Sequence, residues 1–357
     1  MRFVVLPGDG IGPEISGATI QVLDVLNRKL SLGIAFETHE IGLSRLDKDG
    51  STFPDEVLEA ARAADGIILG PVSHSDYPAR DKGGINGSAR LRRELDLYAN
   101  IRPCRSREGL THYGRTPLDL VIVRENTEGF YADRTMFMGT GEFMPTPEVA
   151  IAMRKVTARG SRRIAEAAFE LARARPRRKL TYVHKVNVLK VSDALFLKEC
   201  RAVAQGYPDV ATDDQLIDSM TAMLVRDARR FDVVVTTNMF GDILSDLASE
   251  LSGSLGLGGA INAGDTHCMA QAQHGSAPDI QGQDKANPCS LVLSAAMLLD
   301  WLADKRGLAG LRRGAEAINR AVDALVKNPE TRTRDLGGRL GTKAFTAALC
   351  AEVERGL

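Results

Sequence analysis

Apolar stretches typical of buried strands alternate with amphipathic helical stretches along the first two thirds of the chain. The strand-like stretches are rich in Val, Ile, Leu and Phe and read RFVVLP, LDLVIVRE, KLTYVHKV and FDVVVTT. Helical periodicity follows Pro13 in EISGATIQVLDVLNRKL and recurs in SRRIAEAAFELARAR, while PDEVLEAARAADGIILG combines a helix with a strand. This alternation predicts an α/β fold in which helices flank a large, mostly parallel sheet.

The last third of the chain is predicted to be helical, in the stretches NPCSLVLSAAMLLDWLAD, EAINRAVDALVKN and TKAFTAALCAEVERGL. No internal repeat or Pro/Ser-rich linker divides the sequence, so a second domain is expected to be interleaved with the first. We predict a large domain made of residues 1–100 and 250–357 and a small domain made of residues 101–249. The active site is expected in the cleft between them.

One irregular segment, residues 132–148, reads ADRTMFMGTGEFMPTPE and is rich in Met, Phe and Pro. Two interpretations remain open for it. The segment either forms a loop that lies on its own core, or it forms an arm that packs on a partner subunit.

Composition narrows the class of protein. The chain has 357 residues, of which 44% are hydrophobic, which suffices for one large domain or two closely joined domains. Lys plus Arg and Asp plus Glu both number 46, so the bulk charge does not favour nucleic acid or a membrane surface as a partner.

The cysteines and the N-terminal stretch favour a cytoplasmic location. Five cysteines are scattered without a C-x-x-C pair, which argues against a disulfide framework and against a structural zinc site. The stretch MRFVVLPGDG has the pattern of a strand and a glycine turn rather than a signal peptide. No apolar run approaches the roughly 18 residues of a membrane span.

The stretch NMFGDILSDL, directly after a predicted strand, places Asp242 and Asp246 four residues apart. That spacing puts both carboxylates on one helical face. One interpretation is that they complement the helix dipole near its N-terminus. The other is that they bind a hard divalent cation, Mg²⁺ or Mn²⁺.

Basic and phenolic residues supply further candidate chemistry. Arg92, Arg102 and Arg124 could together bind a substrate with several carboxylates, because guanidinium groups match carboxylates bidentately. Tyr131 could donate a proton, and Lys185 at a strand end could act as a base. Each of these residues alone is more often structural, and their joint presence with the aspartates favours catalysis.

The glycine turn GDGIGPE, residues 8–14, follows the first strand. Its spacing is not G-x-G-x-x-G, and no acidic residue ends a second strand at the expected place, so a Rossmann fold is not indicated. Its glycines would let a ligand approach the backbone.

Seven motifs occur in the order and spacing of one enzyme family: LPGDGIGPE, LRRELDLYANIRP, VRENTEGFY, HKVNV, NMFGDILSDLASELSGSLGL, HGSAPDI and DKANP. On these motifs the chain resembles the β-decarboxylating dehydrogenases, the family of isocitrate, homoisocitrate, 3-isopropylmalate and tartrate/D-malate dehydrogenases. The resemblance runs from the first strand to about residue 345. It implies the isocitrate/isopropylmalate dehydrogenase-like fold and a homodimer or higher oligomer whose subunits share active sites.

The resemblance also implies a reaction. Enzymes of this family oxidise a 2-hydroxy acid by hydride transfer to a nicotinamide cofactor and then release the carboxylate on the neighbouring carbon as CO₂. The resulting enolate is protonated. The matching residues have these implied roles: Asp242 and Asp246, with Asp218 from a second subunit, bind Mg²⁺ or Mn²⁺; Lys185, also from the second subunit, takes the hydroxyl proton; Tyr131 protonates the enolate; and Arg92, Arg102 and Arg124 clamp the carboxylates.

The cofactor implied by the resemblance is NAD⁺. Asp279 stands where bacterial-type NADP-dependent isocitrate dehydrogenases carry lysine followed by tyrosine, and Ile280 replaces that tyrosine. A carboxylate at this position would accept hydrogen bonds from a ribose 2′-hydroxyl and repel a 2′-phosphate. The other implied cofactor contacts are Ile11, His274, Gly275, Ala277 and Asn287.

The sequence departs from the family pattern at Gln271, where family members commonly carry glutamate. It is therefore open whether Gln271 makes the contact with the cofactor that is usual at that position. The segment before Arg92 is also unusual, because Ser88 stands where isopropylmalate enzymes present leucine. Asn86 and Ser88 resemble an inverted form of the Ser-x-Asn pair of isocitrate enzymes. Other residues expected to face the variable group of the substrate are Arg80, Lys82 or Arg90, with Ile85 as an apolar alternative.

We therefore expect oxidative decarboxylation of a small hydroxy di- or tricarboxylate, with isocitrate or homoisocitrate favoured. The stretch VRENTEG supports this preference, since isopropylmalate enzymes usually carry RELTGG there. Alternatives are 3-isopropylmalate, then tartrate or D-malate. A different class is a non-catalytic regulatory subunit of the same fold, which the presence of Tyr131, Lys185 and the three aspartates argues against.

Overall fold

A computed structural model describes residues 1–131, 136–137 and 141–357. One large sheet crosses the whole molecule in the strand order β2-β1-β3-β12-β11-β4-β5-β10-β8-β9. Its strands are β1 (Arg2–Leu6), β2 (Ala35–Thr38), β3 (Gly66–Leu69), β4 (Ala99–Arg105), β5 (Asp119–Glu125), β8 (Lys179–His184), β9 (Ala211–Leu216), β10 (Val233–Thr236), β11 (Ile261–Ala263) and β12 (Cys268–Gln271).

The sheet has two parallel parts joined by an antiparallel centre. The first wing consists of β2, β1, β3 and β12, and the second wing consists of β5, β10, β8 and β9. The pairs β12–β11, β11–β4 and β4–β5 are antiparallel, whereas the pairs on either side of them are parallel. The predicted α/β fold with a large, mostly parallel sheet is confirmed. The antiparallel centre was not predicted, and it separates this fold from a doubly wound Rossmann sheet, which is open and mostly parallel.

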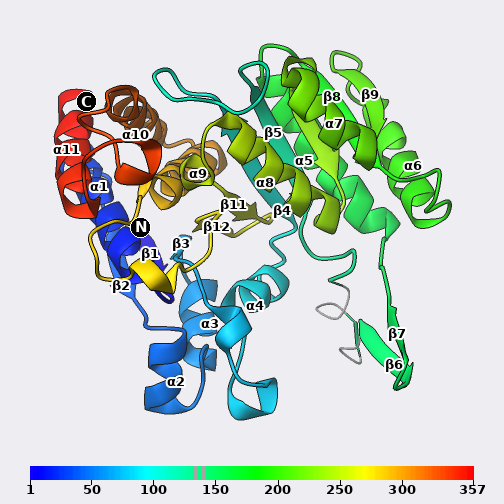
Figure 1. Cartoon of the computed structure of the whole chain (residues 1–357), viewed down its shortest axis with the longest axis horizontal. Helices are drawn as coiled ribbons and strands as arrows, with labels where there is room; N and C mark the ends of the chain where they lie inside the picture. Colours follow the sequence, from blue (N-terminus) through cyan, green and yellow to red (C-terminus); the bar gives the residue numbers. More distant parts are fainter. Residues whose placement is uncertain (132–135, 138–140) are drawn as a thin grey trace.

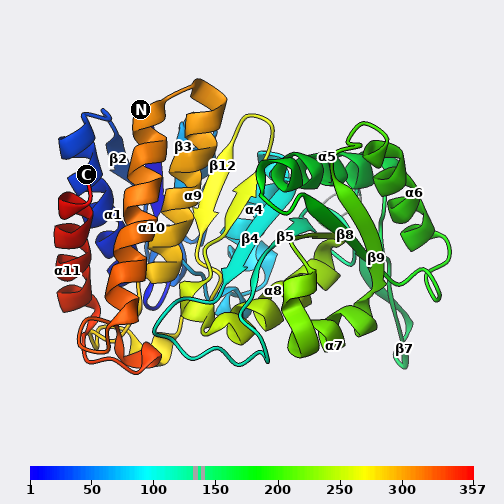
Figure 2. The same cartoon turned by 90° about the horizontal axis from the view of Figure 1, so that it is seen from above.

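Helices cover both faces of each wing, as Figures 1 and 2 show. The helices are α1 (Gly12–Leu30), α2 (Leu43–Asp49), α3 (Asp55–Arg62), α4 (Gly87–Glu94), α5 (Ala158–Ala174), α6 (Ser192–Ala204), α7 (Ile217–Asp227), α8 (Asn238–Ser252), α9 (Cys289–Arg306), α10 (Ala309–Lys327) and α11 (Thr342–Arg355). The three helices predicted in the last third, α9, α10 and α11, pack together with α1 on one face of the first wing.

Buried apolar residues form four clusters. Two of them take their buried members from residues 3–97 and 257–353, on the two faces of the first wing. The other two take them from residues 99–235 and 104–251, on the two faces of the second wing. Strands β4 and β11 pair directly and join the wings at the centre. The domain boundaries given above stay a prediction.

Strands β6 (Glu142–Thr146) and β7 (Val149–Ala152) form a separate hairpin that projects from the body of the molecule (Figure 1). Every residue of both strands is exposed, including Phe143 and Met144. This part of the segment 132–148 therefore does not lie on its own core, which removes the first of the two interpretations for it. Residues 132–135 and 138–140 of the segment lie outside the described residues.

None of the helices in the described ranges is long and apolar enough to cross a membrane.

Candidate active site

The centre of the site lies where β4 and β5 meet the first turns of α8. Arg102 on β4 and Arg124 on β5 are 6% and 2% exposed. The guanidinium group of Arg124 pairs closely with Asp242 of α8, and Arg102 Nη1 lies 3.4 Å from Asp242 Oδ1. Gly241 permits this close approach, because a Cβ atom there would lie 2.6 Å from the Arg124 side chain.

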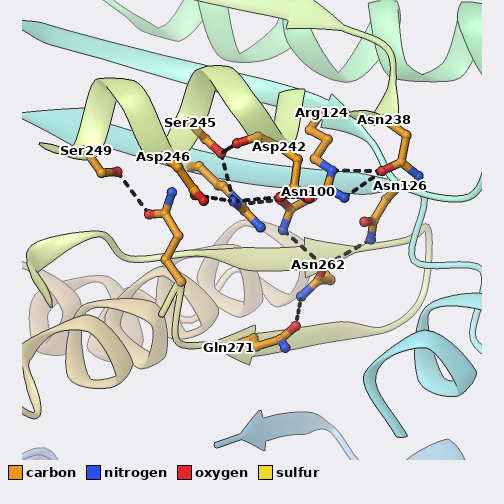
Figure 3. A network of polar contacts seen from close by, with 12 residues as sticks. Asn100, Arg124, Asn126, Asn238, Asp242, Ser245, Asp246, Ser249, Asn262 and Gln271 are labelled. Atoms are coloured by element: carbon orange, nitrogen blue, oxygen red, sulfur yellow. Dashed lines mark hydrogen bonds and ion pairs between the residues drawn. The ribbon is translucent and has the colours of Figure 1, made fainter. Parts of the chain in front are cut away.

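Asp242 and Asp246 lie on the same face of α8, as their spacing predicted (Figure 3). Arg102 Nη1 contacts both carboxylates, at 3.4 Å from Asp242 Oδ1 and 3.3 Å from Asp246 Oδ1. The same nitrogen donates to Ser245 Oγ at 2.7 Å. The two carboxylates therefore face the same guanidinium nitrogen.

The charged groups of the site shift one another's pKa values. Burial acts to raise the pKa of Asp242, but the guanidinium groups of Arg124 and Arg102 outweigh it and hold that pKa below its usual value. Burial and the negative charge of Asp242 raise the pKa of Asp246, against the effect of Arg102. Burial and the neighbouring Arg124 lower the pKa of Arg102 to about 10. Asp242 is therefore the carboxylate that stays ionised most readily.

A cavity of about 280 Å³ opens beside this centre. Six of the residues predicted to bind or convert substrate line it, together with the predicted metal ligand Asp242: Asn86, Ser88, Arg92, Arg102, Arg124 and Tyr131. Tyr131 Oη donates to Asp242 Oδ2 at 3.2 Å, and the Arg124 guanidinium lies 5.7 Å from the centre of the Tyr131 ring. The fold thus brings three arginines, the phenol and one aspartate to a single space.

Side-chain amides hold the arginines in place, and this network was not predicted (Figure 3). Arg102 Nε donates to Asn100 Oδ1 at 2.6 Å, and Asn100 Nδ2 donates to Asn262 Oδ1 at 3.0 Å. Arg124 Nε and Nη2 donate to Asn238 Oδ1 at 2.9 and 2.7 Å. The sequence hint of this network was the pair of polar residues, Asn100 and Arg102, in the stretch ANIRP. Polar side chains in a strand of a large sheet are expected to need hydrogen-bond partners when they are buried.

The segment 80–90 contributes less to the cavity than expected. Among the described residues that line it, this segment supplies Asn86, Ser88 and Ala89. Arg90 turns away, since its guanidinium donates to Phe53 O at 3.1 Å and pairs with Asp55. Ile85 packs against the apolar cluster of α3 and β3. Arg80, Lys82, Ile85 and Arg90 are not among the described residues that line this cavity, and their roles at the variable group of the substrate stay predictions.

A second cavity, of about 250 Å³, adjoins the first, and His274 and Gly275 line both. Six of the seven predicted cofactor residues line this second cavity: Ile11, His274, Gly275, Ala277, Ile280 and Asn287. The seventh, Asp279, is exposed on the adjacent turn Pro278–Ile280. Burial lowers the pKa of His274, so its imidazole is neutral at pH 7.

The turn GDGIG supports this second cavity through its backbone. Gly10 has a φ of +57°, and a Cβ atom there would lie 2.0 Å from Ser276 O. Ile11 N donates to the same oxygen at 2.8 Å. Because glycine has no side chain, the segment 274–277 can pack directly against the backbone of the turn. Asp335, which sequence reasoning missed, lines the cavity and accepts from Asn287 Nδ2 at 2.9 Å.

Lys185 and Asp218 are not brought to either cavity by this chain. Lys185 follows β8 and Asp218 opens α7, and Lys185 Nζ donates to Asp218 Oδ1 at 2.6 Å. Neither belongs to the described residues that line the two cavities.

The residues of α8 fit a divalent metal only as a partial ligand set. Asp242 and Asp246 supply carboxylate oxygens, the ligands that Mg²⁺ and Mn²⁺ prefer. Within the described ranges no group of three or more His, Cys, Asp or Glu side chains is placed to hold a metal ion. Two carboxylates suit Mg²⁺, which is commonly bound through one or two carboxylates together with water and substrate oxygens.

The chain matches the family model described as isocitrate/isopropylmalate dehydrogenase over residues 2–353. The chain belongs to this family. It is 41% identical to the isocitrate/homoisocitrate dehydrogenase of Thermus thermophilus over 349 residues, covering 98% of this chain and 97% of the relative. It is 40% identical to the 3-isopropylmalate dehydrogenase of Archaeoglobus fulgidus over 344 residues, covering 96% and 97%.

Among solved structures, the isocitrate dehydrogenase from Methylococcus capsulatus is similar, with a TM-score of 0.87 and 37% identity over 99% of both chains. The isocitrate/isopropylmalate dehydrogenase family consists of oxidative decarboxylating dehydrogenases that act on small hydroxy acids. Because relatives with different substrate names are about equally similar, identity alone does not assign the substrate.

Proposed function

We propose that the chain catalyses the NAD⁺-dependent oxidative decarboxylation of a 3-substituted malate, with isocitrate or homoisocitrate preferred over 3-isopropylmalate. The observation that carries the proposal is the cavity shared by Arg92, Arg102, Arg124, Tyr131 and Asp242, which adjoins a second cavity through His274 and Gly275. The first suits a polyanion, and the second suits the nicotinamide cofactor.

The three arginines bind and orient the substrate. Arg102 and Arg124 both line the cavity and are held in place, because Arg102 donates to Asn100 and Ser245 and Arg124 donates to Asn238. Guanidinium groups held in this way bind carboxylates bidentately and lose little side-chain entropy on binding. They fix the malate part of the substrate, which all the candidate substrates share.

Proton transfer is assigned to Tyr131 and Lys185. The hydroxyl of Tyr131 lies in the cavity beside Asp242 and delivers a proton to the carbon that has lost CO₂. Lys185, from a neighbouring subunit of a homodimer or higher oligomer, takes the proton of the substrate hydroxyl. When bound, Mg²⁺ or Mn²⁺ on Asp242, Asp246 and the neighbouring subunit's copy of Asp218 supplies positive charge that stabilises the developing negative charge on substrate oxygens.

The second cavity binds NAD⁺, which accepts the hydride. Asn287 and His274 line it, and Ile280 provides an apolar wall. The carboxylate of Asp279 stands exposed beside Ile280, where it favours the 2′-hydroxyl of NAD⁺ over the 2′-phosphate of NADP⁺.

The preference for a carboxylate-bearing third group rests on the wall formed by α4. Asn86, Ser88 and Arg92 line that part of the cavity, whereas Ile85 is partly buried and packs against the apolar cluster of α3 and β3. An isopropyl group against these side chains would desolvate polar groups without replacing their hydrogen bonds, at a cost of about 1–3 kcal/mol.

The test is a side-by-side measurement of kcat/KM for isocitrate, homoisocitrate, 3-isopropylmalate, D-malate and tartrate, followed by NADH absorbance with Mn²⁺ present. Isocitrate or homoisocitrate should give the highest value. A clear advantage for 3-isopropylmalate would contradict the substrate assignment. Silence across the panel, in protein shown by circular dichroism to be folded, would instead indicate a non-catalytic subunit.

A further inference from the structure

A buried ion pair between Arg154 and Asp193 lies at the base of the loop that carries Lys185. Asp193, in the first turn of α6, is fully buried, and the Arg154 side chain is 8% exposed. One carboxylate oxygen of Asp193 pairs closely with Arg154 Nη1, and the other accepts from the backbone N–H of Lys185 at 2.6 Å. A single carboxylate therefore fixes the point where the chain leaves β8.

The loop of residues 185–191 is tied to this carboxylate at both of its ends. Leu189 N donates to Lys185 O at 2.8 Å, and Asp193 N donates to Leu189 O at 3.1 Å. At the tip of its side chain, Lys185 Nζ donates to Asp218 Oδ1, but the Asp218 side chain is 62% exposed. Exposed ion pairs contribute little, so the buried Asp193 is the firmer of the two contacts that hold Lys185.

Arg154 is in turn fixed by the start of α8. Its Nη2 donates at 2.9 Å to the hydroxyl of Thr237, the residue directly before α8, and its guanidinium lies 5.4 Å from the centre of the Phe240 ring. Because these groups fix the guanidinium, the Asp193 carboxylate is held with its second oxygen toward the backbone N–H of Lys185.

The ion pair itself does not reach a bound substrate. Neither Arg154 nor Asp193 belongs to the described residues that line the two cavities. Asp193 contacts Lys185 directly, whereas its link to α8 and Asp242 runs through Arg154. The shorter route of influence is therefore the one to Lys185.

We propose that Asp193 is a positioning residue, which holds the backbone of Lys185 so that Nζ reaches the substrate hydroxyl in the neighbouring subunit's site. The inference rests on the proposed function, since it concerns the base of that reaction. The lysine side chain is long and flexible, so Nζ meets a fixed point efficiently only when its backbone is fixed. Asp193 takes no proton in this role.

The first measurement separates substrate binding from the chemical step. In Asp193→Asn the dissociation constant of isocitrate, measured by calorimetry with Mg²⁺ present, should change less than about threefold, because the arginines of the cavity are untouched. NADH formation in a single turnover should slow about tenfold or more, because Nζ of Lys185 is misplaced.

Glu199→Gln is the matched control for this measurement. Glu199 lies on the same helix, α6, is 7% exposed and accepts from Arg162 Nη2 at 2.8 Å. The variant therefore also removes a carboxylate from an ion pair of α6, but not the one that contacts Lys185. It should keep the single-turnover rate of the intact protein.

Mixed dimers then locate the effect. Asp193→Asn mixed with Asp242→Asn should regain about a quarter of the wild-type activity, because half of the dimers are mixed and each has one site with an intact cavity and an intact Lys185. Asp193→Asn mixed with Lys185→Ala should regain little, because both variants damage the donated base. A general loss of structure would not produce this difference.

Three results would overturn the proposal. The first is an unchanged single-turnover rate in Asp193→Asn that circular dichroism shows to be folded. The second is an equal loss of rate in Glu199→Gln, which would indicate a general weakening of α6. The third is any other mixing pattern: recovery with Lys185→Ala would place the effect in the variant's own cavity, and recovery in neither mixture would contradict the donated base.

If Asp193→Asn does not fold, the double variant Arg154→Gln and Asp193→Asn takes its place with the same expected results. Removing both buried charges together leaves neither of them unpaired. Failure of the proposed function gives a different result, namely intact protein that forms no NADH, or Lys185→Ala that turns over at the full rate. Either of these would contradict the assigned base and the inference together.

Discussion

Lys185 Nζ donates to Asp218 Oδ1 at 2.6 Å, and the pair lies apart from the described residues around the cavity of Tyr131 and Asp242. The two side chains are 24% and 62% exposed, and Val188 and Val191 nearby are exposed apolar residues. A base and a carboxylate on an exposed surface with apolar neighbours suit a subunit interface. We therefore expect this pair to complete the active site of a second copy of the chain.

Shared sites predict that activity returns when two inactive variants are mixed. Lys185→Ala damages the donated pair, and Asp242→Asn damages the receiving cavity. In a mixed dimer one site combines the intact cavity of the first chain with the intact Lys185 of the second. Random mixing should restore about a quarter of the wild-type activity, because half of the dimers are mixed and each has one intact site.

The control for this experiment mixes Lys185→Ala with Asp218→Asn. If one chain donates both residues to the same site, every site in that mixture receives one damaged residue, so little activity should return. Subunits should be exchanged under mild denaturation, and dimer formation checked by sedimentation. No recovery with the Lys185→Ala and Asp242→Asn mixture would place Lys185 in the site of its own chain.

The aspartates of α8 predict a metal requirement. Asp246→Asn should weaken Mn²⁺ binding about tenfold or more, measured by calorimetry, and excess EDTA should abolish turnover. The melting temperature should change little, because the Asp246 side chain is 56% exposed. Glu250→Gln, one turn further along α8, is the matched control and should keep its Mn²⁺ affinity. Full activity in excess EDTA would contradict the metal site and favour the alternative, that the two aspartates complement the helix dipole.

Tyr131 and Lys185 should affect different halves of the reaction. Lys185→Ala should slow formation of NADH in a single turnover, because the substrate hydroxyl loses its base. Tyr131→Phe should preserve that first phase and slow steady-state turnover by about 10²–10⁴-fold, since the phenol is assigned to the protonation after CO₂ loss. The phenylalanine ring keeps the contact with the Arg124 guanidinium. An unchanged steady-state rate in Tyr131→Phe would show that the tyrosine only packs.

The elements that were predicted correctly are those whose pattern of apolar and polar residues lies within their own sequence. The strands β1, β5, β8 and β10 are runs of buried apolar residues, and the amphipathic helix α5 shows its period in its own sequence. Strand β4 was missed because Asn100 and Arg102 occupy it, although both are buried. Short β11 and β12 were missed as well, because their pairing depends on contacts far along the chain.

The same distinction holds for the site. The common face of Asp242 and Asp246 follows from helix geometry alone. The convergence of the three arginines could only be inferred from family resemblance, since Arg92 and Arg124 lie on different elements. The contacts of Gln271 could not be predicted at all. They depend on α4 and β11 reaching the end of β12, which no local pattern records.

The second cavity leads to a prediction about cofactor choice. Ile280 lines it, and Asp279 stands exposed on the same short turn, so the turn presents a carboxylate and an apolar side chain at the edge of the predicted adenosine site. A negative charge there repels a 2′-phosphate, while a lysine would attract it and a tyrosine could donate a hydrogen bond to it.

Combined replacement of Asp279→Lys and Ile280→Tyr should therefore raise the ratio of kcat/KM for NADP⁺ to that for NAD⁺ by at least about tenfold. Asp279→Asn removes the repulsion without supplying a cation, so it should give a smaller rise, and the series separates the two effects. Both cofactors should be compared at saturating substrate, and the ratio should respond to ionic strength because the new contact is between opposite charges near the surface. Asp279 loses its assigned role if the unmodified enzyme already prefers NADP⁺, or if the double variant leaves the ratio unchanged while remaining folded and active with NAD⁺.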